Sequence, residues 1–356
     1  MDDSLSLGDI AQSYPLPRAP LPIVIIGAGG VVNDAHLPAY AKAGFAVQGV
    51  YDRDAARSVT VARKWGIPTV FESLNEAVAT PGVVFDIAVP PVALPEVLET
   101  LPNGAAVLMQ KPMGGDLEAA ARIRALCREK GLRAAVNFQL RFSPMMLAIA
   151  DAHRKGLLGD IVDVEVRLNL RTPWELFSFL KGAGRVEIQV HTIHYLDWVR
   201  SLLGEPRGVW AQTLRDPRVP DLNSTRTSAI LNYGEATRCC LSINHNNPWG
   251  PKHSAAMVKV EGTKGAAIAK LGLLLNYPEG EPDELEIVSE GTSWQAIPLA
   301  GRWFPDAFIG TMSSLQRFVS GESDALPTNV EDGYRTMALV EACYASSACG
   351  ATRVPE

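Results

Sequence analysis

The sequence IVIIGAGGVV at residues 23–32 decides the fold class of this chain. Its four leading apolar residues predict a short buried strand, and the segment after the glycines has a helical pattern. Between strand and helix, Gly27, Gly29 and Gly30 form a tight turn whose backbone N–H groups can approach a pyrophosphate at the positive end of a helix. Val32 occupies the position of the third glycine in the G-x-G-x-x-G fingerprint. This stretch therefore predicts a dinucleotide-binding turn.

An acidic residue follows the second predicted strand at the spacing that such a site needs. Asp52 comes directly after residues 48–51, about twenty residues beyond the glycines, where a carboxylate can accept hydrogen bonds from the adenosine ribose. Its charge would repel a 2′-phosphate, which favours NAD over NADP as the cofactor. The neighbouring Arg53 can instead bind that phosphate, so NADP stays open as the less favoured cofactor. Asp52 can also be a helix N-cap with no ligand role.

Alternating strand and helix patterns continue through the N-terminal part of the chain. Short apolar runs recur at residues 45–51, 83–89, 105–109 and 133–138, and helix-length segments lie at 54–65 and 116–130. This alternation predicts an α/β Rossmann domain with a parallel sheet covered by helices. We assign residues 21–140 to this domain and expect residues 1–20, which are polar and contain three prolines, to form a loose N-terminal arm.

The pattern changes after about residue 140. Helices are predicted at residues 145–156 and 186–203, and strands at 161–170, 208–214, 226–233, 236–244, 255–261 and 266–269. Consecutive strands with little helix between them predict an α+β domain with a largely antiparallel open sheet. Two helices, at residues 305–320 and 330–349, close this C-terminal domain, which we assign to residues 141–356.

Composition narrows the class of ligand and the compartment. The 356 residues carry 33 basic and 39 acidic side chains, a net charge of −6, and the basic residues are scattered. This is not the electrostatic pattern of a nucleic-acid-binding or membrane-surface protein, so we expect a small-molecule ligand. The five cysteines lack disulfide or zinc spacing, and no apolar stretch is long enough to span a membrane. We therefore expect reduced thiols and a cytoplasmic location.

Several motifs, in order along the chain, resemble those of the Gfo/Idh/MocA oxidoreductases. They are GAGG at 27–30, HLPA at 36–39, VPP at 89–91, QKP at 110–112, the segment from Asn137 to RFSP at 141–144, and HYLD at 194–197. The resemblance covers nearly all of the chain after residue 20. Its most specific element is QKP, which is similar to the family's Glu-Lys-Pro motif with Gln110 in place of glutamate.

The resemblance implies a cofactor site and an assembly state. By this similarity, and by the glycine turn and Asp52, the expected cofactor-binding residues are Gly27, Gly29, Gly30, Val31, Val32, Asp52, Arg53, Val89, Pro90, Pro91, Gln110, Lys111, Pro112 and Asn137. Lys111 would lie beside the nicotinamide ribose and the reacting carbon, and Pro112 is often cis in the family. The family resemblance also implies a homodimer or homotetramer.

Two groups would handle the substrate proton. An ammonium group at Lys111 favours a developing alkoxide and can join a proton relay. His194 corresponds to the family's catalytic histidine, and a neutral imidazole can take a hydroxyl proton near pH 7. Many family members carry an acidic residue four positions before this histidine, where this chain has Val190.

The predicted helix offers replacements for that acidic residue. Glu187, His191 and His194 share one face at spacings i, i+4 and i+7. Glu187 can hold His191, or both histidines can hydrogen-bond substrate hydroxyls. The same three side chains can ligate zinc, but no fourth ligand is evident, so we expect no metal.

The expected catalytic residues are therefore Lys111, His194, His191 and Glu187. The expected substrate-binding residues are Lys111, Arg141, Trp174, Glu187, His191 and His194, with Trp174 stacking on a sugar ring or simply packed. Asn246 and Trp249 are further loop candidates.

Three functions follow from this site. The leading one is an NAD-dependent oxidoreductase that takes hydride from a hydroxyl-bearing carbon of a sugar, sugar derivative or cyclitol. A second is an NAD-dependent glycosidase that oxidises, eliminates and re-reduces its substrate with no net redox change. The third is a non-catalytic NAD(P)-binding sensor or co-regulator, against which Lys111 and His194 argue. Because Arg53 can bind a 2′-phosphate, an NADPH-dependent reductase remains an alternative form of the oxidoreductase.

Overall fold

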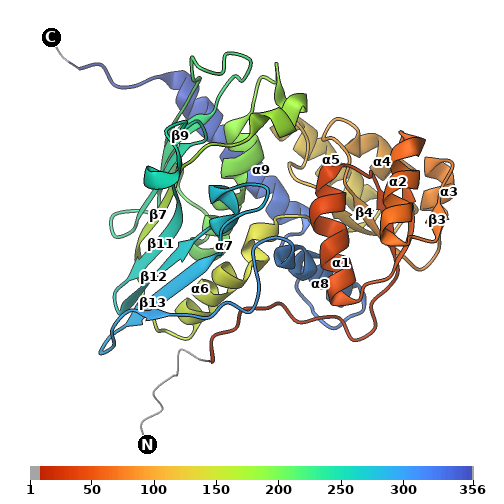
Figure 1. The fold of residues 1–356 in the computed structure, drawn as a ribbon, viewed down its shortest axis with the longest axis horizontal. Coiled ribbons are helices and arrows are strands. Elements are labelled where there is room, and N and C mark those ends of the chain that lie inside the picture. The colour runs from red at the N-terminus through yellow and green to blue at the C-terminus, as the bar shows by residue number, and fades with distance from the viewer. Residues whose placement is uncertain (1–8, 355–356) are drawn as a thin grey trace, which may run out of the picture. The chain divides into compact units, whose positions relative to one another are not determined.

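The computed structural model describes residues 9–354, which form two compact units (Figure 1). One comprises Ser13–Ser143 and Phe304–Ala338, and we call it the parallel-sheet unit. The other comprises residues 9–12, Pro144–Trp303 and 339–354, and we call it the mixed-sheet unit. Each unit contains one sheet and is described by itself.

A six-stranded sheet forms the centre of the parallel-sheet unit. Its strands are β1 (Ile23–Ile26), β2 (Val47–Tyr51), β3 (Thr69–Val70), β4 (Val84–Ile87), β5 (Ala106–Met109) and β6 (Arg133–Val136). They lie in the order β3-β2-β1-β4-β5-β6, and every pair is parallel. This order reverses direction between β1 and β4, which is where a doubly wound sheet binds its ligand. The predicted Rossmann sheet is confirmed.

Helices surround this sheet. They are a π-helical turn (Val32–His36) that leads into α1 (Leu37–Ala43), then α2 (Ala55–Trp65), α3 (Leu74–Val78), α4 (Leu94–Thr100), α5 (Leu117–Glu129), a 3₁₀ turn (Gln139–Phe142), α8 (Asp306–Val319) and the first residues of α9 (Val330–Cys349). Phe308, Met312 and Leu315 of α8 lie in the same buried core as Ile23 and Ile25 of β1. Because α8 buries its apolar side there, residues 304–338 group with the parallel-sheet unit, whereas the sequence analysis placed them in the C-terminal domain.

An eight-stranded sheet forms the centre of the mixed-sheet unit. Its strands are β7 (Ile161–Asn169), β8 (Gly208–Leu214), β9 (Arg226–Asn232), β10 (Arg238–Asn244), β11 (Ala255–Gly262), β12 (Gly265–Lys270), β13 (Glu284–Ser289) and β14 (Gln295–Ala296). The order is β14-β13-β12-β11-β7-β10-β9-β8, and only the central pair β7–β10 is parallel among these described strands. The predicted largely antiparallel sheet is confirmed, with β13 and β14 not foreseen.

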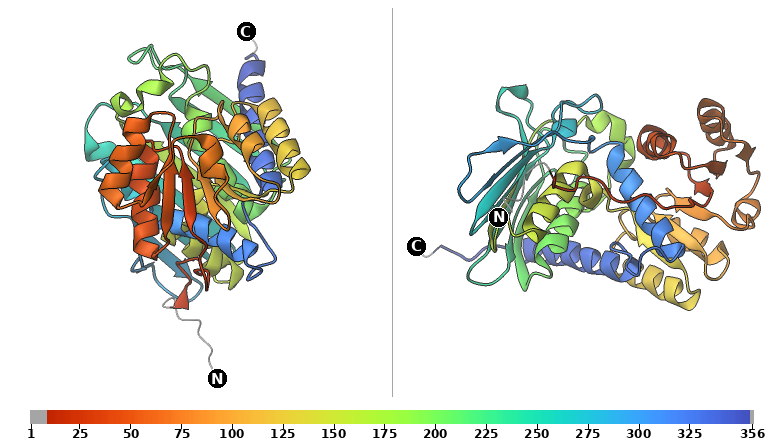
Figure 2. Two further views of the ribbon diagram at one scale, coloured as in Figure 1. Left: turned by 90° about the vertical axis from the view of Figure 1, so that its right-hand side faces the viewer. Right: turned by 90° about the horizontal axis from the view of Figure 1, so that it is seen from below.

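Helices cover one face of this second sheet, as the right-hand view of Figure 2 shows. They are α6 (Pro144–Arg154), a π-helical turn (Ile188–Thr192) that leads into α7 (Ile193–Leu203), and the last part of α9. The unit also has 3₁₀ turns at Trp174–Leu180, Pro251–His253 and Gly272–Leu275. Along β9, buried and exposed side chains alternate. On the exposed side, Trp210 and Ile230 are 61% and 50% exposed.

The described part of the N-terminal segment is held in place, so the expectation of a loose arm is wrong for residues 9–20. Ala11 donates its N–H to Asp151 at 2.8 Å, and Gln12 donates to the Pro298 carbonyl at 3.0 Å. Further along, the Tyr14 ring packs edge-on against Phe142. Residues 1–8 of the predicted arm lie outside the described residues.

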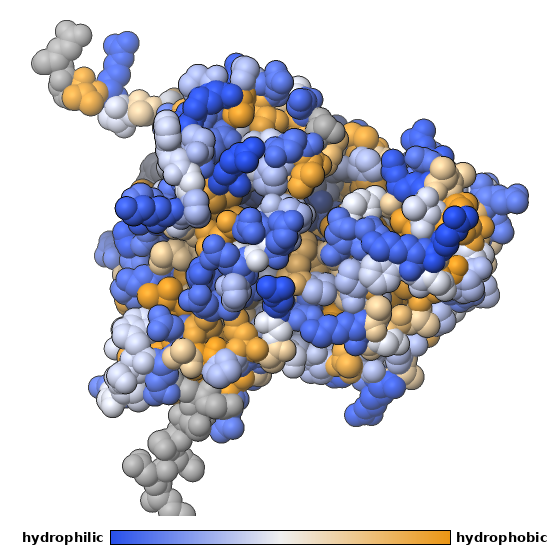
Figure 3. All heavy atoms as spheres, viewed as in Figure 1, coloured by the Kyte–Doolittle hydropathy of each residue, from blue (hydrophilic) through white to orange (hydrophobic). Residues whose placement is uncertain are grey.

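The surface agrees with the mixed composition of the chain. Polar and charged side chains cover most of the face drawn in Figure 3, and apolar ones lie between them in small groups. Within residues 9–354, we find no helix with the length and apolarity that a bilayer crossing requires.

Candidate functional site

In the glycine turn after β1, Gly27 and Gly29 have different surroundings. Gly27 has a φ of +99°, and a Cβ there would lie 2.4 Å from the carbonyl oxygen of Ala88, so the fold itself requires glycine. A Cβ on Gly29, in contrast, would meet no protein atom within 4 Å. The protein therefore leaves open space at position 29, and a glycine there allows a pyrophosphate to approach the backbone. The turn fits the predicted cofactor.

Asp52 is hydrogen-bonded to this turn. Its carboxylate accepts hydrogen bonds from the N–H groups of Ala28 at 2.7 Å and Asp54 at 2.8 Å. The N-cap of α2 is Asp54, whose side chain accepts from the N–H of Arg57, so the alternative that Asp52 is the cap is wrong. Arg57 also lies 3.5 Å from Asp52, and Arg53 is exposed.

The other predicted cofactor residues lie at the same edge of the sheet. Val89-Pro90-Pro91 follows β4, Gln110-Lys111-Pro112 follows β5, and Asn137 follows β6. Since β4, β5 and β6 are parallel neighbours, their carboxyl ends meet at one edge, beside the glycine turn at the end of β1. The peptide bond between Lys111 and Pro112 is cis, as the family resemblance implies.

A buried polar network joins this edge to the first helix. The Asp86 carboxylate accepts from His36 Nδ1 at 2.6 Å and from the Tyr40 hydroxyl at 2.7 Å. Gln110 Nε2 lies 2.7 Å from His36 Nε2, and Gln110 Oε1 accepts the N–H of Lys111 at 3.0 Å. Burial and the Asp86 charge raise the pKa of Tyr40 well above its usual value.

This network fixes the form of His36. Because Gln110 Oε1 faces an N–H donor, its amide NH₂ must face His36 Nε2, which therefore accepts. His36 is then a neutral ring with its proton on Nδ1. Sequence reasoning quoted His36 in a family motif without giving it a role, and it missed Asp86 and Tyr40. The sequence feature that could have indicated this network was a polar residue inside an apolar strand, VFDI at 84–87.

Lys111 is the residue at this edge whose pKa is lowered. Its side chain is half-buried, and desolvation lowers the pKa of its ammonium group to about 8. A lysine with this pKa is mostly charged at pH 7 and can still release its proton close to neutrality.

In the mixed-sheet unit, Glu187 and His191 come together with a histidine that sequence reasoning missed. The carboxylate of Glu187 is fully buried and accepts from the Thr192 hydroxyl at 2.7 and 3.0 Å. His245, in the loop after β10, places Nε2 3.5 Å from Glu187 Oε1 and stacks on His191 with ring centroids 4.2 Å apart. The signal available was the polar run NHNN at 244–247, in which only Asn246 was singled out.

The helix that carries these residues differs from the prediction. Residues 188–192 form a π-helical turn before α7 starts, instead of one α-helix over 186–203. A π-turn shifts the later residues around the axis, and such turns are frequent at functional sites. His194 lies in the first turn of α7 and is 7% exposed. The expected common face of Glu187, His191 and His194 stays a prediction.

Trp174 covers the two stacked histidines. Its ring centroid lies 5.6 Å from that of His191 and 6.0 Å from that of His245, edge-on in both cases. Its indole N–H donates to Asn246 Oδ1 at 2.7 Å. The ring also packs against the apolar cluster of Leu180, Val186 and Leu222. Trp174 is therefore a fixed wall beside the histidines.

The two other predicted loop residues, Arg141 and Trp249, differ from each other in how far they are buried. Arg141, in the parallel-sheet unit, pairs with Asp332 at 2.5 Å and its side chain is 10% exposed. Trp249 is 84% exposed.

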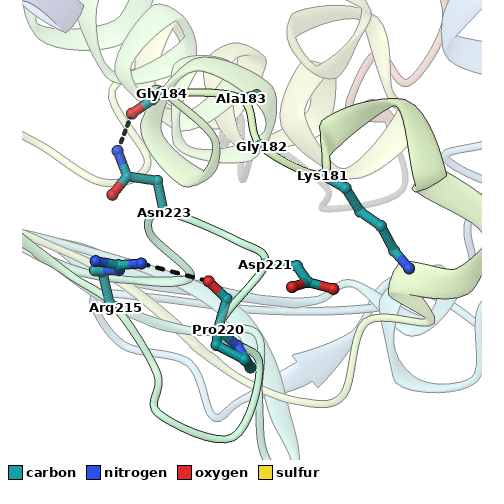
Figure 4. A pocket seen from close by; sticks show the side chains of 8 residues that line it. All are labelled: Lys181, Gly182, Ala183, Gly184, Arg215, Pro220, Asp221 and Asn223. Carbon is teal, nitrogen blue, oxygen red and sulfur yellow. Dashed lines mark hydrogen bonds between the residues drawn. The ribbon is translucent and has the colours of Figure 1, made fainter.

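A surface hollow of the mixed-sheet unit lies along the segment that leads to Glu187 (Figure 4). It is lined by Lys181, Gly182, Ala183, Gly184, Arg215, Pro220, Asp221 and Asn223. Across it, Gly182 donates its N–H to Asp221 O at 3.0 Å and Asn223 donates to Gly184 O. These bonds hold the loop before Glu187, and no predicted site residue lines the hollow.

The sequence matches two family models that together span most of the chain. Residues 21–138 match the oxidoreductase family with an NAD-binding Rossmann fold, and residues 154–355 match its C-terminal alpha/beta domain. The chain belongs to this Gfo/Idh/MocA oxidoreductase family, and its parallel-sheet unit is an NAD-binding domain.

Individual relatives agree with this assignment. An uncharacterized oxidoreductase of Synechocystis is 28% identical over 280 residues, which covers 73% of this chain and 74% of that protein. The D-apiose dehydrogenase of Rhizobium rhizogenes is 23% identical, with 92% and 95% covered. The fold matches a crystal structure of an oxidoreductase from Agrobacterium radiobacter in complex with NAD⁺, L-tartaric acid and magnesium, with a TM-score of 0.77, 20% identity, and 93% and 97% covered.

Removing the Asp52 carboxylate is expected to change cofactor preference. Asp52→Ala should weaken NAD binding roughly tenfold or more, because bonds from the ribose hydroxyls to a charged acceptor are lost, and should weaken NADP binding less. Isothermal titration of both cofactors measures this. The control is Asp54→Ala, which removes the α2 cap and should lower stability by about 1 kcal/mol without changing the preference. Equal losses of NAD and NADP affinity in Asp52→Ala would contradict the assignment.

Proposed function

We propose that this protein is an NAD-dependent dehydrogenase that oxidises a hydroxyl-bearing carbon of a sugar, sugar derivative or cyclitol. The observation that carries the proposal is the position of Lys111. It lies at the carboxyl edge of the parallel sheet with the glycine turn and Asp52, and its pKa is lowered to about 8. The similarity to D-apiose dehydrogenase supports a carbohydrate as substrate.

Lys111 would take the proton that leaves the substrate oxygen. Oxidation of an alcohol removes a hydride from carbon and a proton from oxygen, and bound NAD supplies the hydride acceptor. In its neutral form, the amine of Lys111 accepts the proton and becomes an ammonium group. Gln110 holds the backbone of Lys111 at the end of β5. By family resemblance, His194 shares this proton.

The mixed-sheet unit is proposed to supply substrate-binding residues. Trp174 offers an aromatic wall, and Glu187 and His191 are polar groups beside it. Arg141, whose guanidinium pairs with Asp332, is kept as a candidate substrate-binding residue. The proposed assembly is a homodimer or homotetramer, supported by the exposed apolar side chains of β8 and β9. A cytoplasmic location stays a prediction.

A redox-neutral glycosidase is the second candidate. The observation that favours it is the carboxylate and imidazole pair of Glu187 and His191, which supplies an additional base near the start of α7. A screen with NAD against sugars, cyclitols and aryl glycosides separates the two functions. NADH accumulation supports the dehydrogenase, and aglycone release without NADH supports the glycosidase. If neither NADH nor aglycone accumulates although NAD is bound, the result would favour a non-catalytic sensor.

Loss of the Lys111 amine should abolish turnover with little effect on cofactor affinity. Lys111→Ala is expected to lower kcat at least about a hundredfold, because proton transfer loses its acceptor, and to keep the NAD Kd within about tenfold. The control is Lys42→Ala, which removes an exposed lysine whose ion pair with Asp306 contributes little. Unchanged turnover in Lys111→Ala would refute the role of Lys111.

The oxidation rate should follow the protonation of Lys111. Because the neutral amine is the proton acceptor and its pKa is about 8, kcat/KM is expected to rise with pH and to level off above about 8. Lys111→Arg, which stays charged, should remove this inflection along with most of the activity. Rates with NAD between pH 6 and 10 test this. An inflection near 8 that survives in Lys111→Arg would assign the titration to another group.

A further inference from the structure

Glu187, His191 and His245 form a compact set of possible metal ligands. One ligand atom from each lies within 4.8 Å of the other two. All three belong to the mixed-sheet unit: Glu187 directly precedes the π-helical turn, His191 lies within it, and His245 follows β10. Stacking of the two imidazole rings and the Trp174 wall hold this set together.

The charge of Glu187 is poorly compensated. Its side chain is fully buried, and the Thr192 hydroxyl that donates to it is neutral. Its ion-pair partner in the described structure is His245, whose Nε2 lies 3.5 Å from Glu187 Oε1. A buried carboxylate is costly unless a cation accompanies it.

His245 presents an open nitrogen to the same space. The residue is 1% exposed, and its Nε2 has no hydrogen-bond partner among the described residues. The other ring nitrogen, Nδ1, lies 2.7 Å from the Thr172 hydroxyl. When Thr172 accepts the Nδ1 proton, the lone pair of Nε2 is left facing Glu187. Metal-binding histidines are oriented in this way by a second partner.

The distance between Glu187 and His245 fits two ligands of a small tetrahedral ion. Two ligands of a tetrahedral zinc with bonds of about 2.1 Å lie roughly 3.4 Å apart. Glu187 Oε1 and His245 Nε2 are 3.5 Å apart, which is long for a hydrogen bond and suits two ligands of one ion. His191 is less buried than the other two, and its ligand atom lies within 4.8 Å of theirs.

We propose that Glu187, His191 and His245 bind one divalent transition-metal ion, with zinc preferred. Two imidazoles and one carboxylate suit zinc and disfavour magnesium, which takes oxygen ligands. Three protein ligands leave a fourth position open, as in catalytic rather than structural zinc sites. The proposal concerns metal binding and does not depend on the dehydrogenase activity proposed above. It replaces the sequence-based expectation of no metal, which considered His194 in place of His245.

Zinc titration of the full chain tests the site without reading turnover. After dialysis against EDTA, the protein at pH 7.5 should bind one zinc per chain by calorimetry, and its Tm should rise. Glu187→Gln and His191→Gln should each weaken binding more than about tenfold and remove the rise in Tm. His253→Gln removes an exposed histidine and should bind zinc like the wild type.

Two results would overturn the proposal. One is the absence of zinc binding to a wild-type chain that is folded by circular dichroism, which would assign Glu187 and His245 to a metal-free ion pair. The other is equal zinc affinity in wild type, Glu187→Gln and His191→Gln, which would make the ion adventitious. His191→Gln alters the less buried ligand, so it keeps the test valid if the Glu187 variant does not fold.

Discussion

The hydrogen bond between the buried Asp86 carboxylate and His36 is the interaction on which the cofactor edge depends. Asp86 lies in β4, and through His36 and Tyr40 it holds the segment that follows the glycine turn. The same imidazole accepts from Gln110, which in turn holds the N–H of Lys111. Each buried group left without its partner would cost about 1–3 kcal/mol. The position of Lys111 is therefore set by a polar network inside an otherwise apolar sheet.

Glutamine in place of the family's glutamate changes the charge of this network. A carboxylate at position 110 would need a proton on His36 Nε2 and would make the ring a cation between two anions. With Gln110, the ring is neutral. The negative charge of Asp86 is then stabilised by hydrogen bonds from two uncharged donors, His36 Nδ1 and the Tyr40 hydroxyl. Lys111 then lies next to a neutral amide, and its lowered pKa follows from burial. The substitution therefore favours an amine that can lose its proton near neutral pH.

Much of the fold could be predicted because its signals are local. The strand at 23–26, the glycine turn and the strand at 208–214 follow from apolar runs and spacing, and the structure has them at those positions. The π-helical turn before α7 could not be predicted, since periodicity assumes 3.6 residues per turn. Nor could the contact of Glu187 with His245, because it depends on how β10 is placed in the sheet. Likewise, the apolar face of α8 is visible in sequence, but the sheet that it covers is not.

The protonation state of His36 tests the central claim most directly. Nitrogen NMR of the full chain at pH 7, with His36→Gln to assign the signal, distinguishes the neutral forms of the ring from the cation. The account predicts a neutral imidazole with its proton on Nδ1, shared with Asp86, and Nε2 as the acceptor for Gln110. A protonated Nε2 would mean that Gln110 cannot donate to it and would contradict the proposed anchor of Lys111.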